Sequence, residues 1–191
     1  MEALLIATAY LLGGIPFGYL LGKLKGVDIR KHGSGNVGAT NVARVLGKPY
    51  GVAVYILDFL KGFLPTFIAV KLYGAESWIV TLVGLAAILG HMFSPFLGFK
   101  GGKGVATASG VLFAVDPKLG LLILILWWIV YQISGYVSVG SIAAALGAIF
   151  LSGVFNLPFN LKFLITLASV LVIVKHKDNI LRLEEGRELK V

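Results

Sequence analysis

Residues 119–161 read LGLLILILWWIVYQISGYVSVGSIAAALGAIFLSGVFNLPFNL, and none of these 43 positions is Asp, Glu, Lys or Arg. A helix that crosses a membrane needs about 20 apolar residues, so this run is long enough for two such helices. The small and polar residues from Ser134 to Ser138 mark the point where the chain turns back. The run alone favours a helical membrane protein.

The remainder of the chain has the same character. Of its 191 residues 58% are hydrophobic and only 14% are charged, whereas a soluble domain is about a quarter charged. We therefore predict an all-α fold, a polytopic membrane protein with about seven transmembrane helices in a single integral membrane domain over residues 1–191. The predicted spans are 3–22, 49–70, 77–97, 103–116, 119–134, 137–154 and 158–174.

The distribution of positive charge predicts the orientation. With the N-terminus outside and the C-terminus cytoplasmic, 13 of the 17 Lys and Arg residues fall on the cytoplasmic loops and tail, as the positive-inside rule requires. A net charge of +8 is also typical of nucleic-acid partners. We predict no nucleic-acid partner, because these charges lie beside apolar spans.

Two predicted spans are irregular. Pro16 is expected to bend the first one. In the fourth, only 12 uncharged residues separate Lys103 from Asp116, which is about 18 Å of helix against a hydrocarbon core of about 30 Å. Either these two charges lie at the ends of the span in thinned bilayer, or the helix begins inside the protein and points its N-terminus at a ligand.

Ionisable residues within the spans are expected to be paired. Asp58 and Lys61 are three positions apart in the second span and share a helix face. We predict a structural pair that faces the bundle, with a role beside the active site as the alternative. His91, within the third span, is predicted to be a packed core residue.

The segment Ser34–Arg44, SGNVGATNVAR, is rich in hydrogen-bond donors. Glycine frees backbone N–H groups, and hydroxyl, amide and guanidinium groups add to them, which suits a phosphate. The segment 33–38 matches G-x-G-x-x-G, but no strand precedes it, so a dinucleotide site is not predicted. Lys100–Gly104, KGGKG, lacks the Ser or Thr of a nucleotide phosphate loop, so it indicates phosphate binding without ATP hydrolysis, or an ordinary turn.

The remaining polar residues exclude several kinds of chemistry. There is no cysteine, and the three histidines are scattered, so no metal site and no cofactor are predicted. No H-x-x-x-x-D pair and no G-x-S-x-G elbow occurs. In the C-terminal segment, His176 and Asn179 are three apart and are expected to share a helix face at the membrane exit.

Taken together, three segments resemble one family. SGNVGATNVAR at 34–44, GGKGVAT at 101–107, and HKDNI with RL and GRE within 176–188 are similar to motifs of the bacterial acyl-phosphate-dependent glycerol-3-phosphate acyltransferases. The resemblance covers the whole chain. It implies an enzyme of the bacterial inner membrane, with its active site on the cytoplasmic face.

The resemblance also implies the reaction and the site. Acyl phosphate would donate its acyl group to the 1-hydroxyl of glycerol 3-phosphate, giving lysophosphatidic acid and phosphate beside membrane lipid. The implied catalytic residues are Ser34, Arg44, Lys103 and His176. The implied substrate-binding residues are Ser34, Gly35, Asn36, Thr40, Asn41, Arg44, Gly101, Gly102, Lys103, Gly104, His176 and Asn179, with the glycines of 101–104 supplying backbone donors.

Two hypotheses remain for the group that accepts the proton. A further hypothesis places the protein in another functional class. Either a substrate phosphate oxygen takes the proton of the attacking hydroxyl, which we favour, or His176 is the general base. A membrane transporter for phosphate or a phosphorylated metabolite is the competing class, since it would also have a basic mouth. The sequence makes no prediction of oligomeric state or acyl-chain preference.

Overall fold

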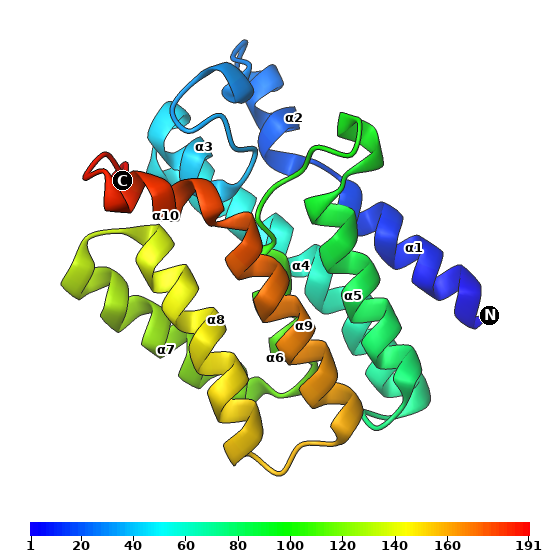
Figure 1. Cartoon of the computed structure of the whole chain (residues 1–191). Coiled ribbons are helices and arrows are strands. Elements are labelled where there is room, and N and C mark those ends of the chain that lie inside the picture. Colours follow the sequence, from blue (N-terminus) through cyan, green and yellow to red (C-terminus); the bar gives the residue numbers. More distant parts are fainter.

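The computed structural model describes residues 1–191 and contains only helices (Figure 1). Ten α-helices and two short 3₁₀ helices follow one another, in agreement with the predicted all-α class. Their bounds are α1 Glu2–Gly14, α2 Phe17–Leu24, η1 Ile29–Lys31, α3 Ala39–Leu46, α4 Lys48–Tyr73, α5 Trp78–Met92, η2 Pro95–Leu97, α6 Val105–Val115, α7 Pro117–Ser134, α8 Val137–Val154, α9 Phe159–Lys175 and α10 Lys177–Glu184.

Five helical segments are long and apolar enough to cross a membrane, and α9 with α10, which meet at a 50° bend, makes a sixth. The five are Glu2–Leu24, Lys48–Tyr73, Trp78–Leu97, Pro117–Ser134 and Val137–Val154. Large apolar side chains such as Leu121, Trp128 and Ile133 are exposed along α7. Exposed apolar surface on this scale requires lipid around it, so the prediction of a multi-pass membrane protein is confirmed.

The first span is broken where proline was expected to bend it. Helix α1 ends at Gly14 and α2 begins at Phe17, because Pro16 has no N–H to continue the ladder. The carbonyl groups freed by the break find partners elsewhere. Ser94 Oγ donates to the Gly14 oxygen at 2.6 Å, and Lys61 Nζ donates to the Ile15 oxygen at 2.9 Å.

Helix α6 is the predicted fourth span, and it does not have the length of one. It has 11 residues, none of them exposed, and it lies in the middle of the bundle near α4 and α9 (Figure 1). It follows directly on Lys103 and Gly104 and ends before Asp116, and neither its first nor its last residue is exposed. Close packing holds it there: a Cβ on Gly62 of α4 would collide with the Thr107 carbonyl, and one on Gly110 with the Phe59 carbonyl.

Polar segments from distant parts of the chain meet at one end of the bundle. Helices α2, α3 and α10 and the C-terminus lie together at this end, and the α8–α9 connection lies at the other (Figure 1). The loop between α5 and α6 joins them, because Lys103 contacts α10. The three motif segments, separated by up to about 140 positions in the chain, are therefore brought to one place.

Candidate functional site

A cavity of about 580 Å³ occupies this end of the bundle and extends inward between the helices. Nine of the twelve predicted site residues line it: Ser34, Asn36, Thr40, Asn41, Arg44, Lys103, Gly104, His176 and Asn179. The other three, Gly35, Gly101 and Gly102, do not. The sequence motifs thus converge on one cavity.

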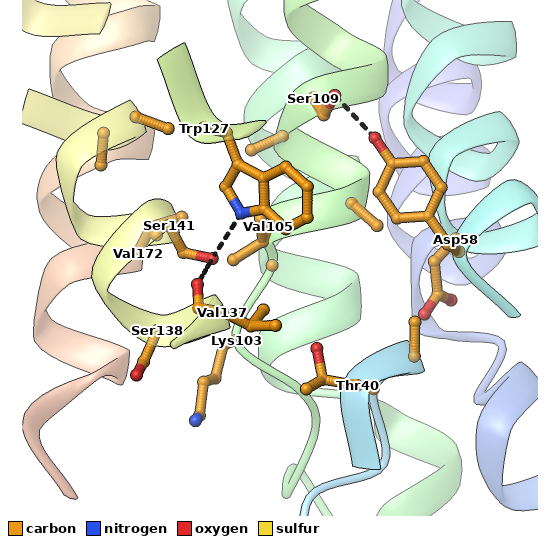
Figure 2. A pocket seen from close by; sticks show the side chains of 18 of the residues that line it. Thr40, Asp58, Lys103, Val105, Ser109, Trp127, Val137, Ser138, Ser141 and Val172 are labelled. Carbon is orange, nitrogen blue, oxygen red and sulfur yellow. Dashed lines mark hydrogen bonds between the residues drawn. The ribbon is translucent and has the colours of Figure 1, made fainter. Parts of the chain in front are cut away.

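The cavity has a polar end and an apolar interior. Figure 2 shows Lys103 and Ser138 at the polar end, with Thr40 facing them and Trp127 further in. Trp127 Nε1 donates to Ser141 Oγ at 3.3 Å, and that hydroxyl donates to the Val137 oxygen at 2.8 Å. Beyond the indole the lining is mostly apolar, and its apolar side chains are Leu112, Val115, Ile123, Ala144, Ala148, Leu164 and Ile165. The Tyr55 and Ser109 hydroxyls, 3.3 Å apart, also belong to the cavity wall.

Asn41 shapes the first loop. Its side-chain oxygen accepts the Ser34 N–H at 2.8 Å, and its amide nitrogen donates to the oxygens of Ile29 and His32 at 3.0 and 3.1 Å. The side chain is only 1% exposed. Because both of its N–H groups are already bonded to the backbone, Asn41 holds the loop together, which differs from the phosphate-donor role expected for it.

The N-termini of two helices add backbone donors. The Ala39 and Thr40 N–H groups begin α3, and the Val105 and Ala106 N–H groups begin α6; none has a carbonyl partner within the protein. All four residues line the cavity. Free N–H groups and the positive end of the helix dipole both favour an anion.

Lys103 is joined to α10 through Asn179. The ammonium donates to Asn179 Oδ1, and Asn179 Nδ2 donates to Glu188 Oε1 at 2.6 Å. Burial, assisted by the positive charge of Arg182, lowers the pKa of the Lys103 ammonium to about 8. Lys103 is therefore still mostly charged at neutral pH, and a bound anion would stabilise that charge.

Glu188 is a site residue that the sequence interpretation did not assign, although it lies in the GRE string. It is buried, and its carboxylate accepts from Ser138 Oγ at 2.9 Å, Asn179 Nδ2 at 2.6 Å and Arg182 Nε at 2.8 Å. Burial alone would raise the pKa of Glu188, but these three hydrogen bonds and the Arg182 charge outweigh it and lower the pKa. Its place in the GRE string was the only signal available, because Asp178, Glu184 and Glu185 are acidic residues of the same tail.

His176 lies between α9 and α10 and is neutral. Its Nδ1 is 2.7 Å from the Val172 carbonyl oxygen. A carbonyl oxygen only accepts, so Nδ1 carries the proton and Nε2 is left as an acceptor. Burial lowers the pKa of the His176 ring to about 4; the Val172 bond opposes this, and the charge of Lys103 assists it. Burial and the charge of Lys103 therefore keep the ring neutral.

Arg44 contacts the strap, which we define as residues 187–191. Its Nε donates to the Lys190 oxygen at 3.0 Å and its Nη2 to the Leu189 oxygen at 2.6 Å. The guanidinium has five N–H groups, so others remain for a ligand. Val191, at the end of the strap, also lines the cavity. The strap therefore lies across the mouth, between α3 and α10.

The glycines of the second loop have a different task from the one expected. The N–H groups of Gly101 and Gly102 donate to the oxygens of Met92 and His91, at 3.2 and 3.1 Å. They are engaged within the protein, since the loop folds back against the end of α5. Gly104 adopts the left-handed conformation, with φ of 83°, and starts α6. The backbone donors of this region are those of α6 itself.

These features define a class: an integral membrane protein with a cavity that is rich in hydrogen-bond donors at one end and mostly apolar further in. Comparison with known proteins identifies the family. Residues 3–186 match the family described as glycerol-3-phosphate acyltransferase. The chain therefore belongs to the glycerol-3-phosphate acyltransferase family.

Individual relatives agree over nearly the full length. The glycerol-3-phosphate acyltransferase of Aquifex aeolicus (strain VF5) is 53% identical over 189 residues, 98% of each chain. That of Geobacter sulfurreducens is 50% identical, over 98% of this chain and 96% of the relative. The crystal structure of PlsY (YgiH), an integral membrane glycerol 3-phosphate acyltransferase in its glycerol 3-phosphate form, superposes with a TM-score of 0.98 at 52% identity, over 100% of this chain and 95% of that one.

Proposed function

We propose that this protein transfers an acyl group from acyl phosphate to the 1-hydroxyl of glycerol 3-phosphate, giving 1-acylglycerol 3-phosphate and inorganic phosphate. One observation carries the proposal: a single cavity joins a donor-rich end, with Lys103 and the N-termini of α3 and α6, to a mostly apolar interior beyond Trp127. An acyl phosphate has this same division between a charged head and an apolar chain.

The solved relatives support the acceptor and the product. One PlsY crystal structure is of the glycerol 3-phosphate form, and a second, with a TM-score of 0.94 and 51% identity, is of the lysophosphatidic acid form. The donor is the part that rests on the chemistry of this site. An acyl phosphate is a mixed anhydride and is already activated, so the protein has to bring two anions together and stabilise the charge that develops.

The proposed step needs no protein nucleophile. The glycerol hydroxyl oxygen attacks the acyl carbon, the bond from that carbon to the phosphate oxygen breaks, and phosphate leaves. A general base works best with a pKa near the working pH, whereas the pKa of His176 is about 4. A substrate phosphate oxygen therefore takes the hydroxyl proton, and His176 accepts a hydrogen bond that orients the substrate.

The remaining predicted residues have binding roles in this proposal. Lys103 and Arg44 neutralise the two phosphates, and the Ser34 and Thr40 hydroxyls donate to them. Asn179 orients Lys103, and Asn36 turns the first loop by accepting the Gly38 N–H at 2.9 Å. The whole chain, residues 1–191, acts as one domain.

The same proposal places the site on the cytoplasmic face of the bacterial inner membrane. The end of the bundle that carries the cavity also carries Lys100, Lys175 and Arg182, beside the strap with Arg187 and Lys190. Positive charge of this kind favours the cytoplasmic side. A transporter would need polar groups along a path across the bilayer, whereas most of the inner lining of this cavity is apolar.

The test supplies purified protein in detergent with glycerol 3-phosphate and palmitoyl phosphate, and follows phosphate release and lysophosphatidic acid together. Equal formation of both, lost in Lys103→Ala, is the expected result. Phosphate release without the lipid would indicate hydrolysis. No product from folded protein would exclude acyl phosphate as the donor, and activity with an acyl thioester instead would replace it.

A further inference from the structure

Three polar side chains form a cluster inside the bundle, and two of them, Asp58 and His91, also line the cavity. Asp58 and Lys61 of α4 make an ion pair of 2.7 Å, and their side chains are only 3% and 5% exposed. His91 of α5 lies with its Nδ1 3.8 Å from the same Asp58 oxygen. We call these three residues the buried cluster. Charged groups at this depth are costly and mark function by default.

One side of the buried cluster reaches the first loop. Lys61 Nζ donates to the Ile15 carbonyl in the break between α1 and α2, and the same oxygen accepts the Phe17 N–H. That break sets the direction of α2. Gly18 of α2 in turn touches the Val37 carbonyl so closely that a Cβ would collide with it. A chain of direct contacts thus runs from Lys61 to the loop that presents Ser34 and Asn36.

The other side reaches the second loop. The His91 carbonyl accepts the Gly102 N–H at 3.1 Å. The His91 ring packs on the same glycine, and a Cβ on Gly102 would collide with its Nε2. Gly102 directly precedes Lys103. The position of the His91 backbone and ring therefore sets the path of the chain into the phosphate-binding lysine.

We propose that the buried cluster is a positioning device that fixes the distance between the two phosphate-binding loops, and so between the two anionic substrates. Asp58 is the shared member: it lies between Lys61, which secures the first loop, and His91, which secures the second. A reaction between two bound anions depends on their mutual placement, and small displacements are costly in rate. The three residues act through the loops, and none is assigned a chemical step.

If the cluster were only a structural ion pair, removing both charges would leave the activity unchanged. A double variant tests this. Removing one member leaves an unpaired buried charge, whereas removing both is often neutral for stability. In Asp58→Asn/Lys61→Met we expect a thermal unfolding midpoint within about 5 °C of wild type, together with a fall in kcat of at least about tenfold. Lys71→Met is the matched control, since Lys71 is an exposed lysine on the same helix.

A second variant keeps the ion pair intact. His91→Gln retains both charges of α4 but removes the ring that packs on Gly102, and we expect at least about a fivefold fall in kcat with an unchanged midpoint. Wild-type kcat and KM in both variants would overturn the inference and leave the cluster as a structural pair. If the double variant does not fold, His91→Gln decides alone.

This inference rests on the proposed function for its kinetic readout, so a binding readout is added. Glycerol 3-phosphate should raise the unfolding midpoint of the wild type and of Lys71→Met, and raise it less in the double variant and in His91→Gln. If the wild type shows no turnover with palmitoyl phosphate, the proposed donor fails while this comparison still tests the cluster. Equal midpoint shifts in all four proteins, with equal kcat where turnover is seen, would refute it.

Discussion

The Lys103 ammonium donates to the side-chain oxygen of Asn179, and this contact joins the loop before α6 to the helix that follows the last span. The other end of the same amide donates to Glu188. With its acceptor and its donor both in use, the amide has one orientation. Lys103 is thereby held at the cavity by residues more than 70 positions away in the sequence. Its ammonium group therefore has a fixed position.

Replacing this lysine should reduce activity strongly. A hydrogen bond to a charged group contributes about 1.5–3 kcal/mol, so Lys103→Ala is expected to lower kcat/KM at least about tenfold. Lys100→Ala is the matched control, because Lys100 belongs to the same loop but is exposed and does not line the cavity. Steady-state kinetics on both would test the assignment, and equal activities would remove Lys103 from the site.

The lowered pKa of Lys103 predicts an alkaline limit. The ammonium loses its proton as pH rises through about 8, so the affinity for anionic substrates should fall above that pH. The expected result is a rise in the KM for glycerol 3-phosphate between about pH 8 and 10. Lys103→Arg keeps its charge in this range and should move the limit upward. A limit that stays in place in Lys103→Arg would assign it to another group.

The fall of kcat at acid pH should not depend on His176. The pKa of its ring is about 4, whereas a phosphate monoester titrates near about 6. If a substrate phosphate takes the proton, the acid limb of kcat lies near that value in the wild type and in His176→Gln alike. An acid limb that disappears in His176→Gln would make the histidine the general base.

Glu188 predicts a loss of stability in acid. Its pKa is lowered in the folded protein, so the stabilisation is complete above the pKa of the unfolded chain and is lost as pH falls through the folded pKa. We expect Glu188→Gln to lose about 2–3 kcal/mol at neutral pH and to depend less on pH below about 4.5. Unfolding followed in detergent from pH 7 to 3 tests this, and parallel curves for the two proteins would contradict it.

The contact between α4 and α6 predicts a packing effect. Gly62→Ala puts a methyl group against the Thr107 carbonyl and should destabilise the protein by about 1–3 kcal/mol. Gly153→Ala is its control, since no atom lies within 4 Å of the added Cβ on α8. That change should be neutral or slightly stabilising. Equal unfolding midpoints for the two variants would show that the helices adjust.

The fold could be predicted to the extent that composition determines it. Charge-free runs located α7 and α8 to within two residues at each end, because lipid imposes a length and a composition on each span. Pro16 located the break in the first span for a local reason. The sequence did not predict whether α6 is buried. Its burial depends on close contacts of Gly62 and Gly110 with other helices, which cannot be read from either segment alone.

The sequence predicted most of the residues that line the cavity, but not which hydrogen bonds their polar groups make. The donor-rich motifs predicted a common site for Ser34, Arg44 and Lys103, and all three line one cavity. Asn41 and Gly102 proved to be bonded within the protein, because an amide or an N–H near a loop satisfies the backbone first. Which hydrogen-bond donors a loop uses for its own backbone depends on its three-dimensional path. Glu188 was missed for the same reason, since its partners come from two separate helices, α8 and α10.

The shortness of α6 has a consequence for how the protein is made. At 11 residues it is about 16 Å long, too short to be recognised as a span during insertion. Only Asp116 separates it from α7, so the two helices would enter the bilayer as one hairpin, with α6 drawn in by α7 and retained by α4. Lys103, at its head, would then reach its depth only after the neighbouring helices have assembled, so the unassembled chain would lack the cavity.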